Sequence, residues 1–444
     1  MFRIIGLLGV CAGVLVAAAD EAEEVKPGVV ASQSVPPAPS TLSLEDLLGI
    51  ALSRNPTLVQ AAAQVQISRG RALQAGLYPN PTVGYVAEQI GSNGTAGEHG
   101  GFFQQEIVTG GKLRLSREKY EWETRQAKAQ WHAQQLRIQS SVRKAFYQTL
   151  VVQRQIEVRR ELFKNANDAL ETTRGLVNVG QANRADLLQA QSQANRIRAE
   201  LRGMEQRYGG HWQTLTAYVG MPELAPVWLS GSPEVSESEV MDQATMLNHL
   251  LSTSPQLAAA RAEVGRDRAG VSREAVEWVP NLNLRGEVAY DYDGGNTIAA
   301  ASVGVKLPLY DRNQGSIMQA KAELARANAE VGRLDLMLRK KFGDHFSTYQ
   351  AALIEAQTFQ KEVLPPAKEA YEAYLQGFQN RRAAWPQVLV AQREYFQLTD
   401  QYLETLRELR EAEAEIQGLF TGDGLDQPPT PTPQGHRDAS PRPR

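Results

Sequence analysis

Cysteine is almost absent from the chain, which has one, Cys11, among 444 residues. Cys11 lies in an N-terminal stretch that has a basic residue at Arg3, an apolar run, and the small residues Ala17–Ala19 before an acidic segment. This order is typical of a secretory signal peptide, so we predict that residues 1–19 are cleaved off. The alternative is a membrane anchor, but the apolar run is short for a bilayer span. A mature chain without cysteine excludes disulfides and thiolate metal sites.

Aromatic residues are also scarce, at 7% of the chain, and the mean hydropathy is −0.38. Alanine, leucine, glutamine, glutamate and arginine supply the bulk, which favours long helices packed through small side chains. Charge of one sign is lacking too, because 47 basic and 50 acidic residues are spread along the chain and leave a net charge of −3. Nucleic acid is therefore not expected as a partner.

Long apolar runs are missing beyond the N-terminus. No segment there has 18 consecutive apolar residues, so the sequence predicts no transmembrane helix. Residues 20–42 are rich in Glu, Pro, Ser and Val, and residues 421–444 are rich in Pro and polar residues. Such compositions are typical of disordered segments. We therefore predict a disordered N-terminal segment at 20–42 and a disordered C-terminal tail at 421–444.

Catalytic and metal-binding constellations are missing as well. The six histidines are single residues without HExxH spacing, and each is expected to be a surface or packing residue. Gly110-Gly111-Lys112 resembles part of a phosphate-binding loop, but Leu113 stands where Ser or Thr is required. We therefore predict no enzymatic activity, no cofactor and no metal site.

What the chain does have is an internal repeat with a period of about 200 residues. The matching segments are Asn55–Leu58 with Ser254–Leu257, Pro79-Asn80 with Pro280-Asn281, and Leu188–Gln191 with Leu389–Gln392. We therefore predict two structural repeats, residues 43–253 and 254–420. Each is expected to contain a helix, two short strands, a very long helix and a returning helix, and the first also an equatorial segment.

The strands are predicted where a Pro-Asn step is followed by alternation with a period of two. They are expected at about 82–90, 101–108, 282–292 and 299–307, with clearer alternation in the second pair. Polar side chains would share one face of the second hairpin, namely Asn283, Arg285, Glu287, Asp291, Ser302 and Lys306. Four strands with an apolar face leave edges and one face uncovered, so something else must complete them.

Coiled-coil periodicity predicts the long helices. Steps of four and three from Ile138 to Val177 meet a single charged residue, Arg159, and a similar seam runs from Phe342 to Tyr374. Pro365-Pro366 is expected to bend the second long helix, because proline removes a backbone donor. A soluble coiled-coil protein, in which each Pro-Asn step only ends a helix, is the alternative reading of these patterns.

Taken together, residues 43–420 resemble the outer-membrane efflux protein family, the TolC-like outer-membrane factors. The resemblance rests on an ordered, duplicated set of segments rather than on one motif. These are the Pro-x-Leu helix starts, PNPTVGY and PNLNLRGEVAY opening the strands, VTGGK and LPLYDRNQG closing them, and LLQAQ with VLVAQR after the turns. LPLYDRNQG and GFQNRRAAWPQVLVAQR are most similar to the heavy-metal branch of Czc/Cus type.

The resemblance implies a mainly α-helical fold with a membrane β part. In this fold long antiparallel coiled-coil helices form an α-barrel tunnel, and four strands from each of three protomers complete one 12-stranded β-barrel. The turns at Pro79, Asn80, Pro280 and Asn281 would lie at the membrane boundary, and the polar strand face would line the barrel lumen. Twelve strands would leave no edge unpaired, whereas the four strands of one chain cannot pair all of their edges.

The implied function is a passive exit duct across the periplasm and the outer membrane in a tripartite efflux system of RND type. Its partners would be two further copies of the chain, a periplasmic adaptor (membrane fusion) protein, an inner-membrane RND pump and outer-membrane lipid. Heavy-metal cations are one candidate substrate class. The alternative is a non-transport periplasmic coiled-coil scaffold or adaptor, which would need no strand hairpins.

Two helical turns are the candidates for the periplasmic entrance and for adaptor docking. Their residues are Gly180, Arg184 and Asp186 in the first repeat and Gly377, Arg381 and Arg382 in the second. Both glycines are expected to take backbone conformations that other residues avoid. In a trimer the arginines would crowd like charges, which Asp186 would offset. The hypothesis is that such contacts hold the mouth shut; the alternative is that these charges are simply solvated.

Overall fold

The computed structural model describes residues 41–234, 242–380, 382–383 and 385–431. The predicted signal peptide at 1–19, nearly all of the predicted disordered segment at 20–42, and tail residues 432–444 lie outside these ranges. No helix in the described part of the chain is both long and apolar enough to cross a membrane.

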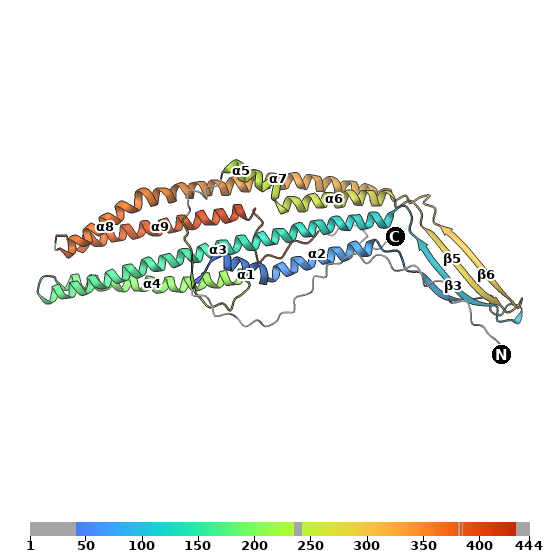
Figure 1. The fold of residues 1–444 in the computed structure, drawn as a ribbon, viewed down its shortest axis with the longest axis horizontal. Helices are drawn as coiled ribbons and strands as arrows, with labels where there is room; N and C mark the ends of the chain where they lie inside the picture. The colour runs from blue at the N-terminus through green and yellow to red at the C-terminus, as the bar shows by residue number, and fades with distance from the viewer. Residues whose placement is uncertain (1–40, 235–241, 381, 384, 432–444) are drawn as a thin grey trace. The chain divides into compact units, whose positions relative to one another are not determined.

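The order of the main elements repeats along the chain (Figure 1). The first half contains α1 (Leu44–Arg54), α2 (Pro56–Ala75), β2 (Thr82–Glu88), β3 (Glu98–Ile107), α3 (Lys112–Asn178) and α4 (Arg184–Val219). The second half contains α5 (Gln243–Thr253), α6 (Pro255–Ala275), β5 (Leu282–Asp291), β6 (Asn296–Val305), α7 (Gln314–Thr358), α8 (Leu364–Gln379) and α9 (Trp385–Gln417). α3 alone has 67 residues, which at 1.5 Å per residue makes it about 100 Å long.

Local sequence sets where the first helices of each half begin. Ser43 caps α1 through a capping box with Asp46. The side chains of Asn55 and Ser254 cap α2 and α6, and both of these helices have proline as their first residue. Proline suits this position because its missing N–H would have no helical partner there. The matching segments of the repeat therefore start matching helices.

The predicted seam of α3 is buried. Ile138, Val142 and Ala145 are at most 3% exposed and pack with Trp212 and Leu215 of α4. The same steps of four and three continue through further buried positions, Thr149, Val152, Ile156, Ala166 and Thr173. The coiled-coil prediction for the first half is therefore confirmed.

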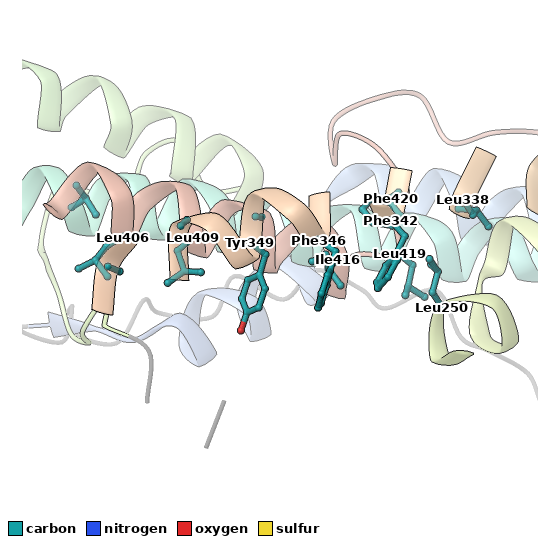
Figure 2. Packing of buried hydrophobic residues seen from close by; sticks show 14 of the residues in the cluster. Leu250, Leu338, Phe342, Phe346, Tyr349, Leu406, Leu409, Ile416, Leu419 and Phe420 are labelled. Carbon is teal, nitrogen blue, oxygen red and sulfur yellow. The ribbon is translucent and has the colours of Figure 1, made fainter. Parts of the chain in front are cut away.

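The core of the second half lies between α7 and α9 (Figure 2). Phe342, Phe346 and Tyr349 of α7 are at most 2% exposed, and Leu406 and Leu409 of α9 belong to the same cluster. The rings of Phe342 and Phe346 stack with their centres 5.2 Å apart. These residues follow the predicted seam.

Further along, the seam of the second half shifts by one residue. Residues Phe359–Val363 form a π-turn between α7 and α8, directly before Pro365-Pro366, where the sequence predicts a bend. A π-turn holds one extra residue in the helix. Tyr371 is consequently buried, whereas Tyr374 is 43% exposed and Ala370 is exposed. The prediction that Ala370 and Tyr374 belong to the buried seam is wrong for this reason.

The four long strands form one antiparallel sheet in the order β2–β3–β5–β6. β3 of the first half pairs with β5 of the second along ten residues, from Glu98 opposite Asp291 to Ile107 opposite Leu282. The two halves of the repeat therefore join in the middle of the sheet. Within the described residues β2 and β6 each pair on one side only.

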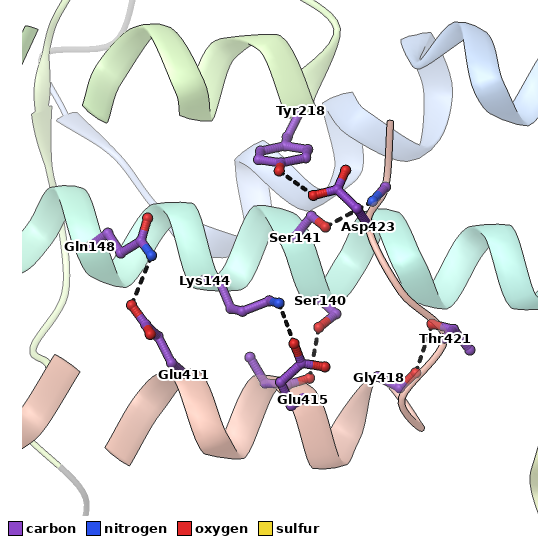
Figure 3. A network of polar contacts seen from close by, with 12 residues as sticks. Ser140, Ser141, Lys144, Gln148, Tyr218, Glu411, Glu415, Gly418, Thr421 and Asp423 are labelled. Atoms are coloured by element: carbon purple, nitrogen blue, oxygen red, sulfur yellow. Dashed lines mark hydrogen bonds and ion pairs between the residues drawn. The ribbon is translucent and has the colours of Figure 1, made fainter. Parts of the chain in front are cut away.

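Two segments differ from the predicted disorder at its inner ends. β1 (Thr41–Leu42) pairs in parallel with β4 (Trp228–Leu229). After α9 the chain returns across α3, where the Gly424 N–H donates to Ser141 Oγ at 2.9 Å (Figure 3). The Tyr218 hydroxyl donates to Asp423 Oδ2 at 2.5 Å. Composition misses such segments because hydrogen bonds to residues far away in the sequence hold them.

Candidate functional site

The sheet has a polar face, because directly opposed residues of antiparallel strands share a face. Arg285 lies opposite Gln104 on one side and Ser302 on the other. The same face carries the other predicted lumen residues within the strands, together with two glutamates of β3: Asn283, Glu287, Asp291, Glu98 and Glu106. Lys306 follows the end of β6 and lines, with Asn283, a hollow of about 660 Å³ at the base of the sheet.

The opposite face of the sheet is apolar and exposed. Val83 of β2, Val288 of β5 and Val303 of β6 are 74%, 58% and 70% exposed. Tyr290 of β5 also lies on this face, and its ring is 4.9 Å from that of Tyr292. An apolar surface of this extent marks a place that another phase or chain covers.

Charges lie close together on the polar face. Arg285 Nη2 is 2.9 Å from Glu287 Oε2, and the Arg285 guanidinium lies 4.5 Å from the centre of the Phe102 ring. Toward the hairpin loops Glu88 lies opposite Glu98, which lies opposite Asp291 on the next strand. Charged groups are costly in an apolar phase, so this face is suited to water and ions.

The second Pro-Asn step ties the two halves together at the base of the sheet. The Thr109 hydroxyl donates to the carbonyl oxygen of Pro280 at 2.5 Å. Asn281 Oδ1 accepts from Lys112 Nζ at 2.9 Å, and Asn281 Nδ2 donates to Glu106 Oε1 at 2.8 Å. Lys112 is 2% exposed, and this burial lowers the pKa of its amino group. These bonds fix the point where helix gives way to strand.

The first Pro-Asn step differs from the second. The carbonyl oxygen of Pro79 accepts from Gln105 Nε2 at 3.0 Å, and Asn80 is exposed. The sequence repeat thus places all four residues at the junction of helix and strand. Among the described residues, the hydrogen bonds of the second step join the two halves of the chain, whereas that of Pro79 stays within the first half.

The turn between α3 and α4 is closed by backbone and capping bonds. Gly180 has a φ of 75°, in the left-handed region that favours glycine. Asn183 and Asp186 form a capping box, in which the Asp186 N–H donates to Asn183 Oδ1 at 2.8 Å and the Asn183 N–H donates to Asp186 Oδ2 at 3.1 Å. Arg184, the first residue of α4, is exposed. The side chain of Asp186 therefore caps the N-terminus of α4, the helix to which it belongs.

The turn between α8 and α9 uses its glycine differently from the prediction. Gly377 lies within α8 and has no positive φ. Its carbonyl accepts from the N–H groups of Arg382 and Ala383, and a Cβ at this position would lie 3.1 Å from that of Ala383. Close approach, not an unusual backbone angle, therefore favours glycine. Arg382 is exposed and makes no ion pair with Asp186 in the described part of the chain, and Arg381 lies outside the described residues.

Contacts between α3 and α9 are functional candidates that the sequence did not identify. Lys144 Nζ is 2.5 Å from Glu415 Oε1, and Gln148 Nε2 donates to Glu411 Oε1 at 2.8 Å (Figure 3). Further along α3, Arg159 pairs with Asp400 of α9. The only signal in the sequence was that Arg159 is the one charge on an apolar seam. Its partner lies 241 residues away, too far for pattern reasoning.

Metal-binding groups are not assembled in the part of the chain that the structure describes. No cluster of three or more His, Cys, Asp or Glu residues there could hold a metal ion. The candidate site consists of the two faces of the sheet, the junction at its base and the two helical turns.

Comparison with known proteins places this arrangement in a class. The sequence model of the outer membrane efflux protein family matches residues 47–221 and 246–422, so the chain belongs to this family. Family members are channels rather than enzymes. The protein is an outer-membrane efflux channel with a TolC-like fold, located in the outer membrane and extending into the periplasm.

Particular relatives agree with this assignment. The chain is 26% identical to the cobalt-zinc-cadmium resistance protein CzcC of Cupriavidus metallidurans over 85% of this chain and 90% of that protein. It is 25% identical to the nickel and cobalt resistance protein CnrC of the same organism, over 66% and 69%. The fold is similar to the outer-membrane channel OprN, with a TM-score of 0.69 and 17% identity over 86% and 90% of the chains. It is similar to CusC at a TM-score of 0.69 and 14% identity, over 86% and 92%.

Proposed function

We propose that three copies of the chain form one exit duct, which docks on a periplasmic adaptor protein and an inner-membrane RND pump. The observation that carries this proposal is the sheet, which has one polar face, one exposed apolar face and two edges without partners among the described residues. Pairing β6 of one copy with β2 of the next closes twelve strands into a barrel without edges. The apolar face then meets lipid and the polar face meets water.

The predicted site residues take roles that follow from this arrangement. Asn283, Arg285, Glu287, Asp291, Ser302 and Lys306 line the lumen. Pro79, Asn80, Pro280 and Asn281 mark the membrane boundary. Gly180, Arg184, Asp186, Gly377, Arg381 and Arg382 belong to the periplasmic entrance and to the surface that receives the adaptor.

Heavy-metal cations are the proposed substrate class. Support comes from the similarity to CzcC and CnrC, whose names record resistance to cobalt, zinc, cadmium and nickel. The acidic row Glu88, Glu98 and Asp291 on the polar face raises the local concentration of cations. The duct contributes passage, while the pump supplies selection and energy.

Edge pairing can be tested by cysteine cross-linking of the full chain, because residues 20–444 contain no cysteine. One cysteine on β2 and one on β6, scanned over the registers between Thr82–Glu88 and Asn296–Val305, should give covalent trimers under oxidation in intact membranes. The matched control places both cysteines on β3 and β5, which pair within one chain and should leave monomers. Monomers alone in every β2/β6 register would rule out the barrel.

The substrate class can be tested in cells that depend on this chain. Removing the gene should raise cell-associated cobalt, zinc and cadmium, measured by mass spectrometry, and Val83→Asp on the apolar face should fail to restore export. Thr82→Asp, one residue away on the polar face, is the matched control and should restore export. Unchanged metal content with increased accumulation of an organic dye would move the substrate to another class.

A further inference from the structure

Basic residues gather on one face of α3 directly after the sheet. Arg114, Arg117, Arg125 and Lys128 are all exposed and recur at a spacing that puts them on the same side of the helix. We name these four residues the α3 basic stripe. The sequence spreads positive charge evenly, so only the helical arrangement brings this group together.

Two shallow hollows run along the stripe. The first, of about 460 Å³, is lined by Arg114, Arg117, Glu118, Glu121, Trp122 and Arg125. The second, of about 340 Å³, shares Arg117, Glu121 and Arg125, and adds Lys128 together with Arg69 and Leu73 of α2. The surface therefore combines basic groups with apolar and aromatic side chains in a continuous groove.

The aromatic part of the groove is fixed in place. A Cβ at Gly265 of α6 would lie 2.5 Å from the Trp122 ring, so the indole packs directly on the backbone of that helix. The guanidinium of Arg125 lies 4.1 Å from the centre of the same ring. This stacking holds a cation over an aromatic face without consuming its hydrogen-bond donors.

Positive charge exceeds negative charge in the groove. Arg114 and Arg117 pair with Glu118 and Glu121 at 3.6 and 2.9 Å, in exposed pairs that are weak in water. Arg125, Lys128 and Arg69 make no ion pair with any described residue. Five basic side chains thus face two acidic ones, which suits an anionic partner.

Exposed apolar residues lie between the groove and the sheet along the chain. Leu73, which lines the second hollow, is 63% exposed, and Leu77 and Tyr78 at the end of α2 are 48% and 65% exposed. The chain leads from there directly into β2, whose Val83 is 74% exposed. Exposed apolar residues therefore recur along the chain from the groove to the start of the sheet.

We propose that the first part of the α3 basic stripe, Arg114 and Arg117, binds the headgroups of anionic phospholipids in the periplasmic leaflet of the outer membrane. These two residues lie about 3 and 8 Å along the helix from the start of α3, at 1.5 Å per residue, and the headgroup layer beside the hydrocarbon core is about 5–8 Å thick. Arg125 and Lys128 lie about 20 and 24 Å along the helix and extend the positive charge beyond this layer. Arginine forks match phosphate oxygens, and basic residues beside a bilayer attract anionic lipids. Tyr78 is a residue type that favours this interface.

The arginines of the stripe lie inside the protomer rather than at its edge, because α3 is flanked within the chain by α2 and α6. Another copy would add one helix further out, beside α2 and β2. This inference goes beyond export, because it holds whichever substrate passes through the duct.

Lipid binding can be measured on the full chain in a neutral detergent by native mass spectrometry, with added phosphatidylglycerol and, separately, phosphatidylcholine of the same acyl chains. The wild-type protein should retain more phosphatidylglycerol than phosphatidylcholine. The combined Arg114→Gln, Arg117→Gln and Arg125→Gln variant should bind it at least about tenfold more weakly, because each basic group contributes near an anionic surface. The control variant Arg174→Gln, Arg196→Gln and Arg202→Gln removes three exposed arginines of α3 and α4 and should bind as wild type does.

A further variant and a competition measurement test whether the bound partner is the lipid headgroup. Glu118→Gln with Glu121→Gln frees Arg114 and Arg117 and should strengthen phosphatidylglycerol binding, which keeps the test informative if the triple variant does not fold. Glycerol 3-phosphate should not compete at concentrations equal to the lipid; full competition would mean a site for free phosphate. Equal retention of phosphatidylglycerol and phosphatidylcholine by the wild type would overturn the proposal. So would a triple variant that keeps its binding to phosphatidylglycerol but no longer binds isolated peptidoglycan.

Discussion

Arg159 of α3 and Asp400 of α9 form a two-pronged ion pair, with Nη1–Oδ1 and Nη2–Oδ2 distances of 2.9 and 2.6 Å. Their side chains are 16% and 30% exposed. The hydrogen bonds that Arg159 donates to Asp400 raise the pKa of the guanidinium, so Arg159 stays charged at any physiological pH. The pair joins the helical hairpin α3–α4 of the first half to α9 of the second, and a movement between these hairpins must break it.

Asp400→Asn and Arg159→Gln should each lower stability by about 1–3 kcal/mol, because each leaves a partly buried partner without its charge. The double variant should cost less than the sum of the two single variants. Thermal unfolding of the four proteins in detergent, followed by circular dichroism, measures this cycle. Strict additivity would show that the two groups do not interact.

The π-turn at Phe359–Val363 predicts which side of α8 is accessible. In a chain whose single cysteine is replaced by Cys11→Ser, Tyr374→Cys should react quickly with a maleimide and Tyr371→Cys slowly. Deleting Gln360 removes the extra residue and rotates α8 by about 100°. After this deletion Tyr374→Cys should react with the maleimide more slowly than Tyr371→Cys. Reaction rates that do not change on deletion would contradict the register shift.

His211 of α4 predicts a loss of stability in mild acid. Burial is the main cause that lowers its pKa, and Arg407 and Arg207 lower it further. Between the folded and the unfolded pKa values the unfolded chain binds more protons, so stability is lost as the pH falls through about 6.5, the unfolded value. The thermal midpoint should therefore fall less between pH 7.5 and pH 5.5 in His211→Gln than in wild type. An equal fall would mean that other groups cause the acid sensitivity.

The arginines of the second turn predict a change in conductance. Arg382 holds its turn through its backbone N–H, which donates to Gly377, so Arg381→Ala with Arg382→Ala should leave the turn intact. If these side chains hold the mouth shut, the double variant should raise single-channel conductance, while Arg184→Ala in the first turn serves as the control. Conductance that matches wild type would make them solvated turn residues.

Sequence reasoning succeeded where a short period carries the information. Alternation around Arg285 and Val288 sorted polar from apolar strand faces, and steps of four and three found the buried seam from Ile138. The duplication strengthened both, because the same order of elements recurs after each Pro-Asn step.

Features that depend on distant or irregular contacts could not be predicted. The π-turn shifts the seam by one residue, which no fixed period describes. Glycine at residue 377 is favoured by the approach of Ala383, and the contact of Gly424 with Ser141 joins residues 283 positions apart. Asp186 caps its own helix, a role that its expected offset of the arginines did not include.

The polar face of the sheet is the central claim, and modification of single cysteines during conductance recording tests it most directly. Glu287→Cys lies on the polar face and Val288→Cys, the next residue, on the apolar face. In planar bilayers a charged thiosulfonate reagent should change the conductance of Glu287→Cys channels stepwise and leave Val288→Cys channels unaffected. The absence of channels from either protein, or a block that occurs only at residue 288, would contradict a duct lined by this face.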